Sequence, residues 1–411
     1  MEQKLIILVV TLLCYSFSIT SNYIMIFPVK EILFLGLLIL CGIKIIKENM
    51  HINKECIFVI LFLMIFLLFW GILGFINGYE KSVFQQAIKI ITTIGIFELF
   101  LFILINNIIS LDKMKRIINT MFFISIIFKI FLEGLYVFNI YDEKSLVDLI
   151  ENIFKMEVMP MFIADGLLLR IGLIIDVLPL SIFPFLLMNS SKKKKIIIII
   201  GIIMCIIINY SRIYMIQFVA LMLVYVFTEI NIKKINIKKI LVGLFLGILV
   251  LSAYNIEGNI INSRFVGEDI EYSDLARVEQ IAAFSKEIPD NFLLGKGLGA
   301  YMRELIRSEE MPFLYEVEWM ALIYQFGFIG IIFMGVIFYY IIKRYHMSYL
   351  DKKIKYLFYI NLLFLFVRSA VNPMLFASNT VIILVCLFVF SKEYFLRNDI
   401  VKNNKKNIEA N

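Results

Sequence analysis

The stretch CIFVILFLMIFLLFWGILGFI, residues 56–76, carries no charged side chain over 21 positions. A helix needs about 20 mainly apolar residues to cross the hydrocarbon core of a bilayer, so this stretch predicts a membrane-spanning helix. Similar runs recur along nearly all of the 411 residues, of which 61% are hydrophobic and 18% charged. Together with a mean hydropathy of +0.89, this composition excludes an ordinary soluble globular protein.

The sequence predicts an all-α integral membrane protein with about 12 transmembrane helices. The expected spans are 5–21, 24–43, 56–76, 86–106, 117–138, 171–189, 196–210, 213–228, 240–254, 319–342, 356–371 and 374–391. Basic residues favour cytoplasmic loops, and every second predicted loop is basic, beginning with Lys44 and Lys47. The N and C termini are therefore predicted to be cytoplasmic, and one large extracytoplasmic loop with short helices is expected.

The predicted spans divide the chain into six parts. They are a five-span N-terminal part (1–138), an outer amphipathic segment (139–170), central spans (171–254), the large extracytoplasmic loop (255–318), three C-terminal spans (319–391) and a basic cytoplasmic tail (392–411). Leu146, Leu149, Ile150 and Ile153 in the second part have helical spacing, which predicts a helix on the membrane surface.

Cysteine and histidine usage limits the chemistry that the chain can perform. Each of the five cysteines lies alone in or beside an apolar run, and no pair has metal-ligand spacing. His51 and His346 both fall in predicted cytoplasmic loops, so neither could act as a base outside. The acidic run Glu268, Asp269 and Glu271 could bind a divalent cation, but solvated loop charge is the simpler interpretation. We therefore expect no metal ion, no cofactor and no nucleic-acid partner.

Arginine is distributed differently from lysine. Most lysines lie in the predicted cytoplasmic loops, whereas seven of the ten arginines are predicted on the extracytoplasmic side of the membrane. These seven are Arg170, Arg212, Arg264, Arg277, Arg303, Arg307 and Arg368. Arginine stays charged and binds phosphate through a planar fork, so the cluster predicts a site for a phosphorylated ligand. For any single arginine at a span end, contact with lipid headgroups is the alternative. Arg264 has no motif behind it.

Several charged residues lie inside or beside predicted spans. Lys129 and Glu133 stand four residues apart, which predicts a local ion pair. Asp176 follows Arg170 on the same predicted span and could pair with an arginine. Glu316 and Glu318 directly precede a span. A carboxylate at a dehydrated membrane rim can act as a general base, although ordinary acidic residues at the end of a polar loop have the same pattern.

The large loop has its own local signals. Ser273 and Asp274 predict the start of a helix that Pro289 ends. A turn containing Gly295, Gly297 and Gly299 follows. The next residues predict a short helix with Arg303 and Arg307 on one face. Because the turn lacks the G-x-x-x-x-G-K-[ST] spacing, we interpret it as a tight turn and not as a nucleotide site.

Two short motifs in the central part resemble the O-antigen polymerase and ligase superfamily, which includes Wzy-type polysaccharide polymerases. Arg170-x-Gly172-x-x-x-Asp176 is similar to the R-x-G segment that opens a central span in that family. Ser211-Arg212 resembles the S-R turn between the two following spans. The predicted topology, with one large outer loop near the C-terminal end, also resembles that of the family.

A third motif lies in the large loop. Arg277, followed by Pro289 and the glycines of the turn, resembles the arginine and P-x-x-G-x-G pattern of the family. The ligases of the superfamily typically carry a histidine about eleven residues before a glycine of the next span. Here the residue eleven positions before Gly327 is Glu316, which favours a polymerase over a ligase.

The resemblance implies an enzyme that polymerises polyprenyl-diphosphate-linked oligosaccharide repeat units into capsular, exo- or O-antigen polysaccharide on the outer face of the bacterial plasma (inner) membrane. The implied diphosphate-binding residues are Arg170, Arg212, Arg277, Arg303, Arg307 and Arg368, with Gly172, Asp176, Ser211, Gly295, Gly297 and Gly299 in support. Glu316 would accept the proton of the acceptor hydroxyl, with Glu318 as the second candidate, in an inverting, metal-independent displacement.

Partners and alternatives follow from the same interpretation. The lipid bilayer and the lipid-linked oligosaccharides are the expected partners, and a flippase and a chain-length regulator are candidate protein partners. A flippase or transporter of lipid-linked glycans is the alternative from another functional class, because charges inside spans also suit transport. The lack of visible two-fold repetition and the lopsided outer loop argue against it. An O-antigen-type ligase is the third alternative.

Overall fold

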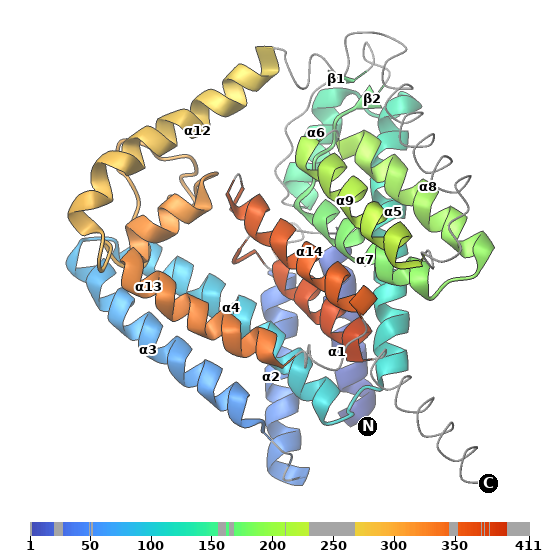
Figure 1. Cartoon of the computed structure of the whole chain (residues 1–411), viewed down its shortest axis with the longest axis horizontal. Helices are drawn as coiled ribbons and strands as arrows, with labels where there is room; N and C mark the ends of the chain where they lie inside the picture. Colours follow the sequence, from blue (N-terminus) through green and yellow to red (C-terminus); the bar gives the residue numbers. More distant parts are fainter. Residues whose placement is uncertain are drawn as a thin grey trace.

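The computed structural model is built almost entirely of helices (Figure 1). It describes residues 2–19, 28–48, 50, 52–154, 162–163, 168–209, 211–229, 268–344, 352–370, 372–373, 375–377 and 379–392. Arg264 and the predicted span 240–254 lie outside these residues, as do the side chains of the acidic run 268–271. The expected all-α class is confirmed, with one two-residue antiparallel pair, β1 (Phe162–Ile163) and β2 (Leu168–Leu169), as a minor addition.

Helices from distant parts of the chain pack together, as the helix Glu318–Lys343 does against the helix Lys54–Ile76. The N-terminal helices are α1 (Glu2–Ile19), α2 (Val29–Glu48), α3 (Lys54–Ile76), α4 (Glu80–Ile105) and α5 (Leu111–Val137). The others are α6 (Glu143–Ile153), α7 (Val177–Met188), α8 (Lys192–Asn209), α9 (Arg212–Glu229), α12 (Glu268–Glu287), α13 (Glu318–Lys343), α14 (Lys352–Ser369) and a last helix, Asn379–Lys392. Figure 1 shows α3, α4 and α13 on one side, α5 and α7–α9 on the other, and α14 between them.

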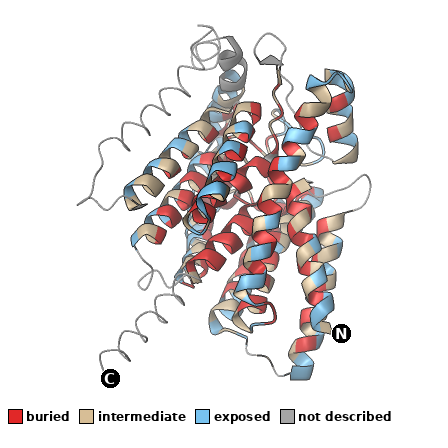
Figure 2. Ribbon diagram, turned by 90° about the vertical axis from the view of Figure 1, so that its right-hand side faces the viewer, coloured by how far each residue is buried: buried red, intermediate tan, exposed pale blue. Residues whose placement is uncertain are grey.

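Five of the described helices are long and apolar enough to cross a membrane. They are α1, α3, α4, α5 and α13. The burial pattern fits a lipid environment, because charged side chains such as Lys30, Glu98 and Lys129 are buried while Leu61 and Leu68 are more than half exposed (Figure 2). In lipid, intramembrane charges face the bundle interior and apolar side chains face outward. The protein is therefore an all-α membrane protein.

Several predicted boundaries differ from the structure: α4 and α5 each begin six residues before the expected 86 and 117, and further differences occur near residue 171 and in the large loop. The span expected from residue 171 begins as a regular helix only at Val177, after an extended stretch and a short 3-10 turn, Ile174–Asp176. The Asp176 carboxylate accepts the Leu173 N–H at 2.9 Å and so replaces a helical hydrogen bond. In the large loop, α12 begins at Glu268, upstream of the expected Ser273, but ends as expected just before Pro289, which starts a 3-10 turn.

The short helix expected to carry Arg303 and Arg307 does not form. Residues 300–317 adopt turns. Their backbone groups bond to side chains far along the chain: the Met302 N–H donates to the Tyr315 hydroxyl at 2.8 Å, and Gln325 Nε2 donates to the Ala300 carbonyl at 3.0 Å. These tertiary bonds satisfy polar groups that a helix would otherwise pair within itself.

Candidate functional site

The segment between β2 and α7 is held by a buried carboxylate. Asp176, 6% exposed, accepts hydrogen bonds from Lys129 Nζ at 2.5 Å and from the Asn209 side-chain amide. The expected Lys129–Glu133 ion pair is therefore wrong: Glu133 instead accepts the Leu169 N–H at 2.9 Å. The partner in direct contact with Asp176 is also a lysine and not an arginine.

Arg170 belongs to the same network. Its Nε donates to the backbone carbonyl of Asn209 at 3.2 Å, while the side chain of Asn209 bonds to Asp176. Asn209 is the last residue of α8, so the C-terminal end of this helix joins both predicted site residues. Gly172 lies between them in the extended stretch that precedes the 3-10 turn.

Arg368, near the end of α14, reaches the same region from the other side. It is only 1% exposed, and its guanidinium carbon lies 4.5 Å from the centroid of the Tyr214 ring on α9. Its Nη2 donates to Gln217 Oε1, whereas its Nε is buried without a hydrogen-bond partner among the described residues. Arg170, Asp176 and Arg368 all act electrostatically on the Tyr214 hydroxyl. We call these four residues the Tyr214 group.

The expected turn between α8 and α9 is confirmed. Ser211 precedes α9, and its carbonyl oxygen accepts the N–H groups of Tyr214 and Met215, both at 3.1 Å. Arg212, half-buried, is the first residue of α9. The turn thus places Arg212 on the same helix as Tyr214, two residues away.

Glu316 lies between two arginines of the large loop. Its Oε2 is 3.0 Å from Arg277 Nε, and its Oε1 accepts a hydrogen bond from Arg307 Nη2 at 2.9 Å. We call these three residues the Glu316 triad. Arg303 lies apart from the triad, exposed beside Gly78 at the turn between α3 and α4. Of the three loop arginines that the structure describes, it thus joins two, through a carboxylate that the sequence proposed as a base.

The glycine turn packs against helices. Gly295, Gly297 and Gly299 have φ angles of +70°, +96° and +76°. The N–H of Gly297 donates to the Gln325 carbonyl at 2.8 Å, that of Leu298 to the Trp70 carbonyl at 2.7 Å, and that of Gly299 to Gln86 Oε1 at 2.5 Å. Because these amides are already bonded inside the protein, the turn has no nest of amides for a phosphate.

Glu318 occupies a separate polar pocket. It is 6% exposed, and its Oε2 accepts the Leu375 N–H at 2.8 Å. The pocket is also lined by Lys89 and Tyr315, and Lys89 and Glu318 attract each other electrostatically. Desolvation raises the pKa of Tyr315 to about 12, so its phenol stays protonated at neutral pH.

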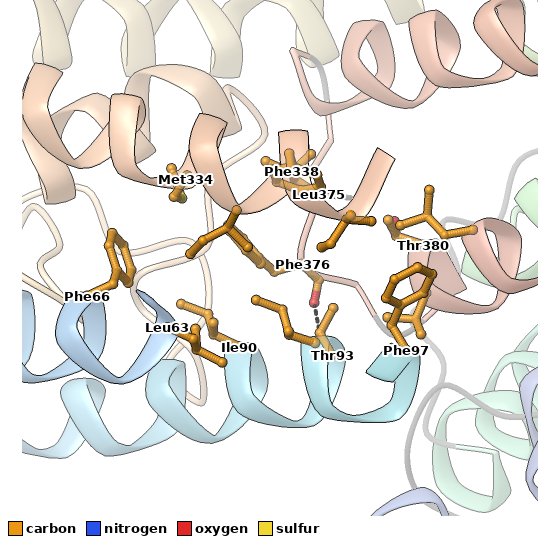
Figure 3. Close-up of a pocket in the computed structure, with 15 residues that line it drawn as sticks. Leu63, Phe66, Ile90, Thr93, Phe97, Met334, Phe338, Leu375, Phe376 and Thr380 are labelled. Carbon is orange, nitrogen blue, oxygen red and sulfur yellow. Dashed lines mark hydrogen bonds between the residues drawn. The ribbon is translucent and has the colours of Figure 1, made fainter. Parts of the chain in front are cut away.

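A small apolar cavity adjoins this pocket between α3, α4, α13 and the last helix. Ile90 and Phe376 line both spaces. Figure 3 shows its aliphatic and aromatic lining, with a single hydrogen bond among the drawn residues, from Thr93 Oγ1 to the Phe376 carbonyl at 3.0 Å. None of the described residues that line this cavity is charged.

The sequence did not single out Asn209, Tyr214, Gln217 or Lys89 as site residues. Gln217 is a polar side chain inside an apolar run, three residues after Tyr214, so both lie on one helix face. That signal could have marked them as partners of an intramembrane charge.

No protein-family model and no curated protein sequence matches the chain. The resemblance to the O-antigen polymerase and ligase superfamily therefore rests on the three short motifs and on the predicted topology. The first two motifs are adjacent in space, since Arg170 and Tyr214 belong to one group and Arg212 lies on α9.

Proposed function

We propose that the protein is a membrane glycosyltransferase that polymerises polyprenyl-diphosphate-linked oligosaccharide units on the outer face of a bacterial plasma membrane. In this proposal, 12 helices span the bilayer with both termini in the cytoplasm, following the basic loops of the sequence. The Tyr214 group and the Glu316 triad then lie on the outer side, where such a substrate would be used.

The observation that carries this proposal is the incomplete charge compensation of Arg368. Among the described residues no carboxylate contacts its guanidinium, whose partners are the neutral Gln217 amide and the face of Tyr214. Asp176 acts on it only from a distance and is itself bonded to Lys129. A buried cation is costly unless an anion accompanies it. The diphosphate of a lipid-linked donor would supply that anion.

The proposed reaction is a single displacement. The acceptor hydroxyl oxygen attacks the anomeric carbon of the donor sugar, and the bond from that carbon to the diphosphate oxygen breaks. The electron pair leaves with the polyprenyl diphosphate, whose growing charge is stabilised by Arg368, Arg170 and Arg212. The hydroxyl proton passes to a glutamate.

The structure favours Glu318 over Glu316 for that glutamate. Both oxygens of Glu316 already interact with guanidinium groups, so Glu316 is better suited to position Arg277 and Arg307. Glu318 lines the pocket beside Lys89, where a sugar hydroxyl could approach. The sequence suggested Glu316 as the base and Glu318 as the second candidate, and this assignment reverses that order.

The test uses purified protein in detergent with polyprenyl-diphosphate-linked repeat units, and polymer is resolved by gel electrophoresis. We expect Arg368→Met to lower polymer formation about 10²–10³-fold, the usual effect of removing one group that stabilises a developing anion. The protein should stay folded, because the substitution removes an incompletely paired charge and keeps an apolar stem. Arg116→Ala, at an exposed arginine of α5, is the matched control.

Two outcomes would reject parts of the proposal. Without a compartment to cross, a flippase would make no polymer in detergent, so a wild-type protein that yields none would refute the enzyme. Unchanged polymer from Arg368→Met would remove Arg368 from the site. Glu318→Gln should abolish turnover, whereas Glu316→Gln should weaken it; the reverse order would return the base to Glu316.

A further inference from the structure

The loop after α12 closes a break in α13. Gly327 inside α13 has a φ of +61° and a ψ of −175°, which interrupts the helix. An alanine Cβ at Gly327 would lie 2.4 Å from the Leu293 carbonyl oxygen, so the loop backbone touches the helix backbone. The chain around residues 292–299 therefore fits into the gap that the break opens.

Hydrogen bonds between the loop and the broken helix replace the missing helical ones. On one side of the break, the carbonyls of Tyr324 and Gln325 accept the N–H groups of Lys296 and Gly297 at 2.9 and 2.8 Å. On the other side, the N–H groups of Phe328 and Ile329 donate to the carbonyls of Phe292 and Leu293 at 2.8 and 3.1 Å. Irregular backbone is tolerated at membrane depth only when its polar groups are satisfied in this way.

Trp70 of α3 fixes the depth of the loop. Its indole N–H donates to the Leu294 carbonyl at 2.8 Å, and its own carbonyl accepts the Leu298 N–H. Trp70 lies six residues before the end of α3 at Ile76, which corresponds to about 9 Å along the helix axis at 1.5 Å per residue. The loop thus enters well below the ends of the neighbouring spans.

The side chains at the tip of this loop are apolar and exposed. Phe292 is 48% exposed, Leu293 62% and Leu294 39%. The Phe292 ring stacks on Phe328 of α13, with centroids 5.7 Å apart. From Phe328 the exposed apolar surface continues along α13 to Ile332, which is 51% exposed. The tip is thus continuous with the face of a candidate membrane span.

We propose that Phe292, Leu293 and Leu294 form a re-entrant tip that inserts into the acyl-chain region of the bilayer. Lipid chains are the occupant that fits, because the surface is apolar, the carbonyl oxygens of its three residues accept hydrogen bonds inside the protein, and it extends the outward face of α13. The insertion anchors the C-terminal end of α12 to the membrane. This contact does not depend on which reaction the protein catalyses.

The test places a nitroxide spin label at Leu293→Cys in the full-length protein, reconstituted into phosphatidylethanolamine–phosphatidylglycerol vesicles. Collision rates are measured with oxygen, which concentrates in lipid, and with a water-soluble nickel chelate. Ile332→Cys on α13 is the lipid-facing control, and Arg303→Cys in the outer loop is the aqueous control. The labelled parent chain gives the background from its own cysteines, of which only Cys56 is not fully buried.

A high oxygen rate and a low nickel rate at position 293, matching Ile332→Cys, are expected. A nickel rate similar to that of Arg303→Cys would place the tip in water and overturn the proposal. Low rates for both reagents would also overturn it, because they would mean that protein covers the tip.

Discussion

Replacing Gly297 by alanine should destabilise the protein strongly, because this residue lies where two backbones meet. The new Cβ would lie 2.1 Å from the Gly74 nitrogen and 2.5 Å from the Leu73 carbonyl carbon of α3. These are backbone atoms, which cannot rotate away as a side chain can. The residue also has a φ of +96°, a conformation that residues with a Cβ rarely adopt.

The size of the effect is the sum of two costs, that of the left-handed backbone conformation and that of the steric clash. The left-handed conformation costs an L-residue about 1–2 kcal/mol. Overpacking a close contact costs about 1–3 kcal/mol. We therefore expect Gly297→Ala to lower the free energy of unfolding by about 2–5 kcal/mol. If the loop moves away instead, the bond from the Gly297 N–H to Gln325 is lost, which also destabilises the protein.

Unfolding by sodium dodecyl sulfate in mixed micelles, followed by tryptophan fluorescence, measures this change. Trp70 is a direct reporter, since its carbonyl accepts the Leu298 N–H. Gly335→Ala in α13 is the matched control: a Cβ there meets no atom within 4 Å, and alanine favours a helix by about 0.5–1 kcal/mol. A Gly297→Ala protein as stable as the Gly335→Ala protein would refute the close approach of the loop to α3.

Two further predictions concern carboxylates, the buried Asp176 and the exposed Asp142. Asp176→Asn leaves the Lys129 ammonium without its ionic partner and should cost about 3–5 kcal/mol in the same unfolding assay, while Asp148→Asn at an exposed position should change little. Asp142 caps the N-terminus of α6, and hydrogen bonds from Ser145 lower its pKa. Its stabilising effect should therefore be full above its unfolded pKa and be lost as pH falls through the lower folded value. The protection factors of the α6 amides, which correct the exchange rates for their intrinsic pH dependence, should fall accordingly, and Asp142→Ala should remove this change.

Helices that consist of apolar runs could be predicted from the sequence. The span expected at 56–76 is α3, Lys54–Ile76, and the span expected at 319–342 is α13, Glu318–Lys343. Run length alone decides such elements, because lipid requires about 20 apolar residues in a row. The break at Gly327 could not be predicted in this way, since a glycine inside an apolar run is compatible with a continuous helix.

Partners of the charged residues were harder to predict. Helical spacing suggested that Lys129 pairs with Glu133, but its partner Asp176 lies 47 residues away. Arg307 was expected to share a helix with Arg303, whereas tertiary bonds hold that segment in turns and bring Arg307 to Glu316. Residues three or four positions apart share a face only where the segment forms a helix. Contacts between distant segments depend on how the helices pack.

The arginines differ in whether a carboxylate contacts the guanidinium group. Arg277 and Arg307 share the carboxylate of Glu316, so each guanidinium already contacts an anion and one of their two positive charges is offset. Arg368 is more deeply buried than either, and only neutral groups touch it among the described residues. An anion should therefore gain most at the Tyr214 group, where its charge completes a set of partners that the protein alone leaves incomplete. If the number of arginines alone decided anion binding, the exposed Arg303 would matter as much as Arg368. If the lack of a contacting carboxylate decides it, replacing Arg368 will weaken binding more than replacing Arg303.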